Sequence, residues 1–327
     1  MALAKVVLTD YVWESLEVEK QTLAGLGELT ALQTKTPAEF LAQAADCDAL
    51  LNTYAGPITA ADMAKMPRCK IIARYGIGVD TIDLDAATAA GIIVTNNPTY
   101  CIEEVAEHTM ALLLSAARKI TFYDRQVRAG NWAVPPGKPI QRLAGSTLGL
   151  VGFGNIARQV AIRAAAFGMR VIGVTGTPRA LPGFDQILPR ERLLDAVAEA
   201  DFLCVLLPWT PANDKIIDAR VLGAMKPDAF LVNIARGGVC DEEALLEALQ
   251  QKRIAGAALD VFSREPLDSA HPFWGMENTV QLGWSDYMTN PSYEVFGTPG
   301  NRVFVMEWNG PEYYYTGANI NGQVALF

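Results

Sequence analysis

The chain has 327 residues, 50% of them hydrophobic and 19% charged, which predicts about two globular domains and argues against disorder or a small stapled scaffold. Acidic residues number 36 against 27 basic ones, so the net charge is −9. Because an acidic chain repels phosphate backbones, we expect no nucleic-acid partner.

The spacing of the cysteines and the length of the apolar runs indicate the cellular compartment of the protein. The five cysteines are widely spaced and contain no C-x-x-C pair, so neither a disulfide framework nor a zinc site is indicated, and no metal is expected. Residues 1–8 lack the charged start and long apolar core of a signal peptide, and no apolar run is long enough to cross a membrane. We therefore expect a cytoplasmic protein with reduced thiols and no membrane partner.

Short apolar, β-branched runs alternate with helix-like stretches in residues 1–100. Such runs are typical of strands buried on both faces of a parallel sheet, so the alternation predicts an α/β fold. The expected strands are 5–9, 49–52, 71–74 and 92–95, and the expected helices include 37–45 and 84–90.

A long helix and a break in the chain precede a second α/β series. Residues 102–120 carry acids early and bases late, which predicts one long helix that bridges two domains. The Pro/Gly-rich stretch 134–139 follows, and further strands are expected at 146–151, 170–174, 202–207, 230–234 and 255–259.

We predict one domain at 1–100 and a second at 101–287. Residues 288–327 are a candidate for completing the first domain. Gly and Pro recur in this tail wherever a helix would need continuity, so a short hairpin with 303–306 as one strand is the alternative to a helix there.

A glycine-rich turn follows the expected strand at 146–151. It reads Gly-Phe-Gly-Asn-Ile-Ala from Gly152 to Ala157, the G-x-G-x-x-A pattern of dinucleotide-binding turns. Gly152 permits the tight turn, and Gly154 lets the backbone approach a pyrophosphate, whose charge rests on the helix N-terminus at Asn155 and Ile156. An ordinary strand-to-helix turn is the alternative, but the flanking strand and Ala-rich helix favour a dinucleotide.

The residues after the strand at 170–174 bear on the cofactor. A carboxylate that binds the adenosine ribose is expected at this point, but the segment from Thr175 to Arg179 contains none. Arg179 is a candidate partner for the 2′-phosphate of NADP, and a solvated loop charge is the equal alternative. NAD and NADP both remain open.

Several motifs together resemble one enzyme family. Beside the glycine-rich turn stand Asn233-Ile-Ala-Arg236-Gly and Asp260-Val-Phe-Ser-Arg-Glu265-Pro, and with Tyr75-Gly-Ile-Gly-Val-Asp80 they resemble the D-isomer-specific 2-hydroxyacid dehydrogenases. Within that family, Tyr100-Cys-Ile-Glu-Glu-Val-Ala is most similar to the branch that includes C-terminal-binding proteins.

The resemblance implies two doubly wound parallel-sheet domains around one cleft. They would be a flavodoxin-like substrate domain and a Rossmann-like cofactor domain. It further implies a homodimer formed through the cofactor domain, and hydride transfer between NAD(P) and a small 2-oxo or 2-hydroxy acid of the D series.

The same resemblance assigns catalysis to Arg236 and Glu265. Arg236 matches the family's arginine, which holds the substrate carboxylate and polarises the carbonyl, and it follows the expected strand at 230–234. Glu265 matches a carboxylate that orients the catalytic histidine and raises its pKa. A surface salt-bridge arginine and a loop acid are the ordinary alternatives.

Further positions are carried over for binding. The backbone amides of Gly76, Ile77 and Gly78 match a second contact to the substrate carboxylate. Asp260 matches a residue that contacts the nicotinamide amide, with a cap or loop role as the alternative. The other residues expected to line the nicotinamide pocket are Leu207, Pro208, Asn233 and Ala235.

One departure from the family is large. Residues 279–284 resemble the family's next strand and the Gly-Trp that follows it. The family has its histidine in a Pro-His pair after that strand, but residues 279–287 contain no histidine. The two histidines of the chain, His108 and His271, match non-catalytic family positions, and a structural role is favoured for each. Asp286 or Tyr287 could substitute. The alternatives to an enzyme are a non-enzymatic NAD(P)(H) sensor that binds a partner and a degenerate family member.

Overall fold

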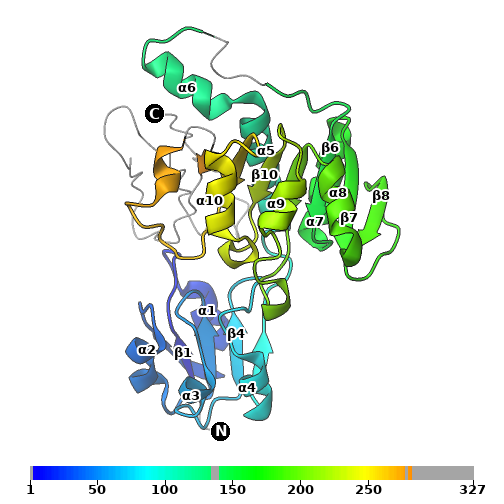
Figure 1. Cartoon of the computed structure of the whole chain (residues 1–327). Helices are drawn as coiled ribbons and strands as arrows, with labels where there is room; N and C mark the ends of the chain where they lie inside the picture. The colour runs from blue at the N-terminus through cyan, green and yellow to red at the C-terminus, as the bar shows by residue number, and fades with distance from the viewer. Residues whose placement is uncertain (1–2, 134–139, 277–278, 282–327) are drawn as a thin grey trace. The chain divides into compact units, whose positions relative to one another are not determined.

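The computed structural model describes residues 3–133, 140–276 and 279–281 (Figure 1). The described chain forms two compact units that divide between Tyr100 and Cys101. The Pro/Gly-rich stretch at 134–139, the tail at 288–327 and its candidate hairpin at 303–306 lie outside the described residues. Each unit is built on a parallel sheet, so the predicted α/β class with two parallel-sheet domains is confirmed.

The first unit has a five-stranded sheet in the order β2-β1-β3-β4-β5, with every pairing parallel. All of these strands except β2 were predicted from the sequence. The five residues of β2 are only half-buried or exposed, so they form no apolar run. The strands are β1 (Ala4–Leu8), β2 (Gly27–Ala31), β3 (Ala49–Asn52), β4 (Ile71–Arg74) and β5 (Ile93–Thr95).

Local signals in the sequence set the helix limits of this unit. Pro37 stands in the first turn of α2, where its missing N–H costs nothing. Asp83 caps α4 by accepting a hydrogen bond from the backbone N–H of Ala86 at 2.9 Å. The helices are α1 (Glu17–Leu23), α2 (Pro37–Ala44), α3 (Ala60–Met63) and α4 (Leu84–Ala89).

The second unit has a seven-stranded sheet in the order β12-β11-β10-β9-β6-β7-β8, again with parallel pairings throughout. Strand β8, at one edge of this sheet, was not predicted from the sequence. The strands are β6 (Thr147–Val151), β7 (Arg170–Thr175), β8 (Gln186–Pro189), β9 (Phe202–Val205), β10 (Phe230–Asn233), β11 (Gly256–Leu259) and β12 (Thr279–Gln281).

The predicted single helix at 102–120 is wrong in one respect. It ends at Arg118, and Lys119 adopts a left-handed conformation with φ +57°, so a second helix starts at Ile120. Both helices belong to the second unit. The helices here are α5 (Ile102–Arg118), α6 (Ile120–Arg128), α7 (Asn155–Ala166), α8 (Leu193–Glu199), α9 (Ala219–Ala224) and α10 (Glu242–Gln250).

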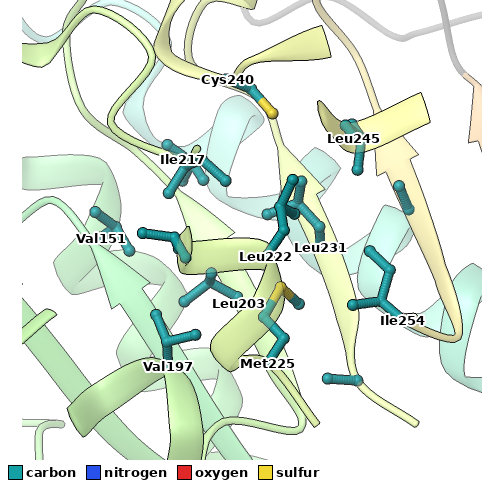
Figure 2. Close-up of a cluster of buried hydrophobic side chains, with 14 of the residues drawn as sticks. Val151, Val197, Leu203, Ile217, Leu222, Met225, Leu231, Cys240, Leu245 and Ile254 are labelled. Atoms are coloured by element: carbon teal, nitrogen blue, oxygen red, sulfur yellow. The ribbon is translucent and has the colours of Figure 1, made fainter. Parts of the chain in front are cut away.

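Helices cover both faces of this sheet. On one face, Val197 of α8, Leu222 of α9 and Leu245 of α10 pack against strand residues such as Leu203 and Leu231, as Figure 2 shows. On the other face, buried side chains of α5 and α7 pack against β6, β9 and β10. Strands covered on both sides explain the continuous apolar runs of the sequence.

Candidate functional site

Strand β6 lies between β7 and β9, so the chain reverses its winding direction at this point of the sheet. Ligands of doubly wound folds bind outside the carboxyl ends of the strands at such a switch point. Gly152 follows β6 with φ +120°, and a Cβ there would lie 2.7 Å from the carbonyl carbon and oxygen of Leu206. Only glycine fits this backbone.

The first turn of α7 is open to a ligand. Gly154 stands at the N-cap position without a capping side chain, so no side chain satisfies the first amides of the helix at Asn155 and Ile156. A Cβ at Gly154 would have no other heavy atom within 4 Å, whereas Ala157 is fully buried against the sheet. Free amides beside open space fit the pyrophosphate of a dinucleotide.

The loop after β7 carries the two residues predicted to face the adenosine ribose. The Thr175 hydroxyl accepts a hydrogen bond from the Thr177 amide at 3.2 Å, and Arg179 is exposed. No carboxylate side chain stands between them. The choice between NAD and NADP is therefore still a prediction.

The loop after β9 reaches the glycine-rich turn. The closest neighbours of Gly152 are the backbone atoms of Leu206 and Leu207, so the predicted pocket residues Leu207 and Pro208 lie beside this turn. The Pro208 carbonyl accepts a hydrogen bond from the side-chain Nδ2 of Asn213 at 3.1 Å, which holds the loop in place.

Asn233, the last residue of β10, shapes the turn that carries Arg236. This asparagine is 1% exposed; its Oδ1 accepts from the Ala235 amide at 3.1 Å, and its Nδ2 donates to the Arg236 carbonyl at 3.1 Å. Buried polar atoms with both roles satisfied rigidify a turn. The half-buried Arg236 donates from Nη1 to the Ala235 carbonyl at 2.8 Å.

Gly237 and Gly238, which were not predicted as site residues, follow Arg236 in this turn. A Cβ at Gly237 would lie 1.9 Å from the carbonyl carbon of Phe262, and a Cβ at Gly238 would lie 2.7 Å from Nε1 of Trp209. The turn after β10 and the loop after β11 thus touch backbone to backbone. This contact brings Arg236 next to the segment that contains Asp260 and Glu265.

Asp260 follows β11, and its backbone N–H donates to the Asn233 carbonyl at 3.0 Å. Its side chain is 14% exposed and pairs with His108 of α5, with 3.1 Å between Oδ1 and Nε2. A structural role was predicted for His108, so its contact with Asp260 was not expected from the sequence. The partner of a histidine on a helix can be identified only once the packing of that helix against the sheet is known.

Glu265 accepts a hydrogen bond from the Phe262 amide at 2.8 Å. Although part of its side chain is exposed, protein atoms surround the carboxylate, and this desolvation raises the pKa of Glu265 above its ordinary value. The positive charge of Arg236 opposes the increase, and the negative charges of Asp260 and Glu242 add to it. Arg236, Asp260 and Glu265 therefore share one electrostatic environment at the carboxyl edge of β10 and β11.

In the first unit, the predicted glycine loop follows β4. The Gly76 amide already donates to the Arg74 carbonyl at 3.0 Å, and the Ile77 carbonyl accepts from Nδ2 of Asn96 at 2.8 Å. Within the described residues, the amides of Ile77 and Gly78 have no hydrogen-bond acceptor. These two amides, rather than all three, are available to an anion.

Asp10 organises the loop next to this one and was not selected from the sequence. This aspartate is 6% exposed, and its carboxylate accepts from the backbone amides of Thr53, Tyr54 and Ala55 at 3.2, 2.6 and 3.2 Å. A carboxylate that accepts several backbone N–H bonds fixes a loop strongly. The signal was available, since Asp10 directly follows the first strand.

His271 caps the short helix at Pro272–Gly275, where its Nδ1 accepts from the Phe273 amide at 3.3 Å. Asp286 and Tyr287, the candidate replacements for the family histidine, lie outside the described residues. All five cysteines are buried. In the described ranges there is no group of three or more potential metal-ligating side chains, and none of the described helices has the length and hydropathy of a membrane span.

The second unit has the fold of a Rossmann-like dinucleotide-binding domain. Residues 110–284 match the family model described as "D-isomer specific 2-hydroxyacid dehydrogenase, NAD binding domain". The chain belongs to the D-isomer specific 2-hydroxyacid dehydrogenase family, which confirms the resemblance found in the sequence.

Named relatives agree with this assignment. A glyoxylate reductase of Korarchaeum cryptofilum is 41% identical over 244 residues, which are 72% of each chain. A D-3-phosphoglycerate dehydrogenase of Methanocaldococcus jannaschii is 36% identical over 90% of this chain, but the match spans only 56% of that protein. This chain thus spans about half the length of the phosphoglycerate dehydrogenases it matches.

A solved structure is similar over most of both chains. The NADPH-dependent glyoxylate/hydroxypyruvate reductase of Sinorhizobium meliloti, in complex with NADP and malonate, superposes with a TM-score of 0.75. It is 32% identical, and the match covers 86% of this chain and 86% of that one.

Proposed function

We propose that the protein transfers a hydride between NAD(P) and a small 2-oxo or 2-hydroxy acid of the D series. The observation that carries this proposal is the gathering of Arg236, Asp260 and Glu265 at one sheet edge, in the same unit as the open turn at Gly154. The family and the named reductases support it.

The residues divide the binding work. The turn from Gly152 to Ile156 would hold the pyrophosphate of the cofactor. Thr175 and Arg179 would face the adenosine ribose. The remaining predicted residues lie at or just after the carboxyl ends of β9, β10 and β11, on the other side of the switch point, where the nicotinamide half belongs. They are Leu207, Pro208, Asn233, Ala235 and Asp260. The bound cofactor supplies the hydride chemistry.

Arg236 would bind the substrate carboxylate and polarise its carbonyl, because a guanidinium forms charge-assisted hydrogen bonds to both. We propose the first unit as the substrate domain, in which the amides of Ile77 and Gly78 would bind a carboxylate. The carbonyl oxygen also needs a proton. Glu265, whose carboxyl has a raised pKa, would support this acid–base work.

The test is a steady-state assay of NADH and NADPH oxidation with glyoxylate, hydroxypyruvate and pyruvate. Arg236→Ala should lower kcat/KM at least about 100-fold, the usual cost of removing a polarising donor. Arg264→Ala, which removes an exposed arginine of the neighbouring loop, is the matched control and should keep normal turnover. Equal activity of the two variants would contradict the assignment of Arg236.

The enzyme proposal competes with a non-enzymatic dinucleotide sensor, which the missing histidine favours. The named relatives give this alternative no support. Tight cofactor binding without turnover on any of the acids would favour it. Membership of the branch with the C-terminal-binding proteins stays a prediction.

We also propose a homodimer and a cytoplasmic location. None of the nine residues of α6 is buried, Val127 and Ile120 are about half exposed, and Trp132 is 90% exposed, so an apolar surface is available to a second copy. Light scattering should give about twice the 35.4 kDa of one chain, and Val127→Asp with Trp132→Ala should halve it. Ile162→Asp, at a position of α7 that is 51% exposed, is the control. The wide spacing of the five cysteines, without a C-x-x-C pair, supports the cytoplasmic location.

A further inference from the structure

His108 and Asp260 form a close pair inside the second unit. His108 lies on α5, Asp260 follows β11, and 3.1 Å separates the imidazole Nε2 from the carboxylate Oδ1. The two side chains are only 16% and 14% exposed. The pair therefore stands in a shielded position at the carboxyl edge of the sheet, where the cofactor's nicotinamide half is proposed.

The chemistry of the two groups fixes the direction of this hydrogen bond. An ionised carboxylate can only accept, so the imidazole must carry its hydrogen on Nε2 and donate it to Oδ1. The backbone N–H of Asp260 donates to the Asn233 carbonyl at 3.0 Å, so hydrogen bonds fix both the backbone and the side chain of Asp260. In the described part of the chain, Oδ2 of Asp260 has no hydrogen-bond donor.

We propose that His108 is a positioning residue for the nicotinamide. By holding Oδ1 it leaves Oδ2 as the acceptor for the carboxamide N–H of the ring, and so sets the orientation of the ring at the sheet edge. This inference rests on the proposed function, because it needs a nicotinamide cofactor over β11.

A purely structural role explains the pair less well. Helix α5 is already anchored by side chains that pack under it, including Ala106 at 0%, Met110 at 5% and Leu113 at 0% exposure. The helix therefore does not need a polar contact to stay on the sheet. Enclosing an imidazole and a carboxylate costs desolvation energy, which a ligand contact would justify.

The experiment compares the Kd of NADH with the Kd of ADP-ribose, which has the adenosine, pyrophosphate and ribose parts but no nicotinamide. His108→Leu should weaken NADH binding about 10-fold, the effect of losing one oriented hydrogen bond to a charged group, and leave ADP-ribose within about twofold. His108→Gln, whose amide can donate to Asp260, should restore NADH binding to within about threefold. Calorimetric titration gives both constants without turnover.

Further variants keep the test decisive if His108→Leu folds poorly. Asp260→Asn should show the same selective loss of NADH affinity, and in the double variant the two losses should not add, since both act through one contact. Glu107→Gln, an exposed neighbour on the same helix with a side chain 65% exposed, is the matched control and should change neither Kd.

The outcomes separate the inference from the proposed function. Parallel loss of both affinities in His108→Leu, with NADH affinity not restored in His108→Gln, would indicate a structural role and overturn the inference. Unchanged NADH affinity in His108→Leu and Asp260→Asn would also overturn it. If the wild-type protein binds neither NADH nor ADP-ribose, the proposed function fails first and the inference fails with it.

Discussion

Two glycine turns of the second unit differ in why they contain glycine. In the turn after β10, a Cβ at Gly237 would lie 1.9 Å from the Phe262 carbonyl carbon and 2.1 Å from the Ser263 nitrogen. In the turn after β6, a Cβ at Gly154 would meet no heavy atom within 4 Å. The protein's own backbone requires the first glycine, whereas only a ligand would require the second.

The largest expected effect comes from Gly237→Ala. Its methyl group would collide with backbone that cannot rotate away, so the turn and the loop after β11 must separate, at a cost of about 3 kcal/mol or more in the free energy of unfolding. Urea unfolding measures this loss. Gly223→Ala, inside α9 with 3.6 Å to the Arg253 guanidinium, is the control and should be neutral or stabilising by about 0.5–1 kcal/mol. Equal stability of the two variants would refute the contrast.

Gly154→Ala should separate binding from stability. We expect the free energy of unfolding to change by less than about 0.5 kcal/mol, because the new methyl group meets open space. Cofactor affinity should fall about 10-fold, equivalent to about 1.4 kcal/mol, because the methyl group keeps the pyrophosphate away from the backbone.

The matched variant in the same turn is Gly152→Ala. The backbone there has φ +120° and approaches Leu206, so this change should lower stability as well as affinity. A Gly154→Ala protein that unfolds as easily as Gly152→Ala would show that the open turn is structural after all.

Glu265→Gln tests the loop that Gly237 touches. The folded-state pKa of Glu265 is raised, so its contribution to stability is full below its unfolded pKa and is lost as pH rises through the folded value. Glutamine does not titrate but still accepts from the Phe262 amide. The free energy of unfolding of the variant, relative to that of wild type, should therefore increase as the pH rises from about 4 to about 7.5. Urea unfolding at both pH values measures this difference.

The sign of this effect has its own check. Arg236 lowers the pKa of Glu265 by its charge, so in an Arg236→Met background the same comparison should give a larger pH-dependent difference. A difference that runs the opposite way with pH would contradict the raised pKa.

The smallest effect is expected from Gly76→Ala in the first unit. A Cβ there would lie 3.2 Å from the guanidinium carbon of Arg74, and a long side chain can move by a few tenths of an ångström. Stability should change by less than about 0.5 kcal/mol. If the amides of Ile77 and Gly78 bind the substrate carboxylate, KM for glyoxylate should rise while the Kd of NADH stays constant. A stability loss comparable to that of Gly237→Ala would show that the protein's own atoms require glycine at position 76, as they do at Gly237.

Much of the fold was predictable because its strands are short apolar runs. The two strands that were missed, β2 and β8, contain residues such as Glu28 and Gln186 and lie toward the edges of their sheets. The helix break at Lys119 was also missed, because the pattern of apolar and polar residues does not indicate that a lysine adopts a left-handed conformation. Local periodicity therefore predicts the centre of each sheet better than its edges and its breaks.

The site was predictable where a residue belongs to a contiguous motif. Gly152 and Arg236 were selected in this way, whereas the pairing of His108 with Asp260 joins segments separated by 152 positions. The crowding at Gly237 likewise depends on a loop that meets it only in three dimensions. Such contacts require the docking of helix and loops on the sheet, which no spacing in the sequence encodes.

The central position of β6 has a consequence for how the second unit is made. β6 is its first strand to leave the ribosome, and β7 and β8 can pair with it soon afterwards, but its other neighbour begins only at Phe202. Until then one edge of β6 stays unpaired, and unpaired edges invite aggregation. We therefore expect a chaperone to be needed most after β8 and before β9 has left the ribosome.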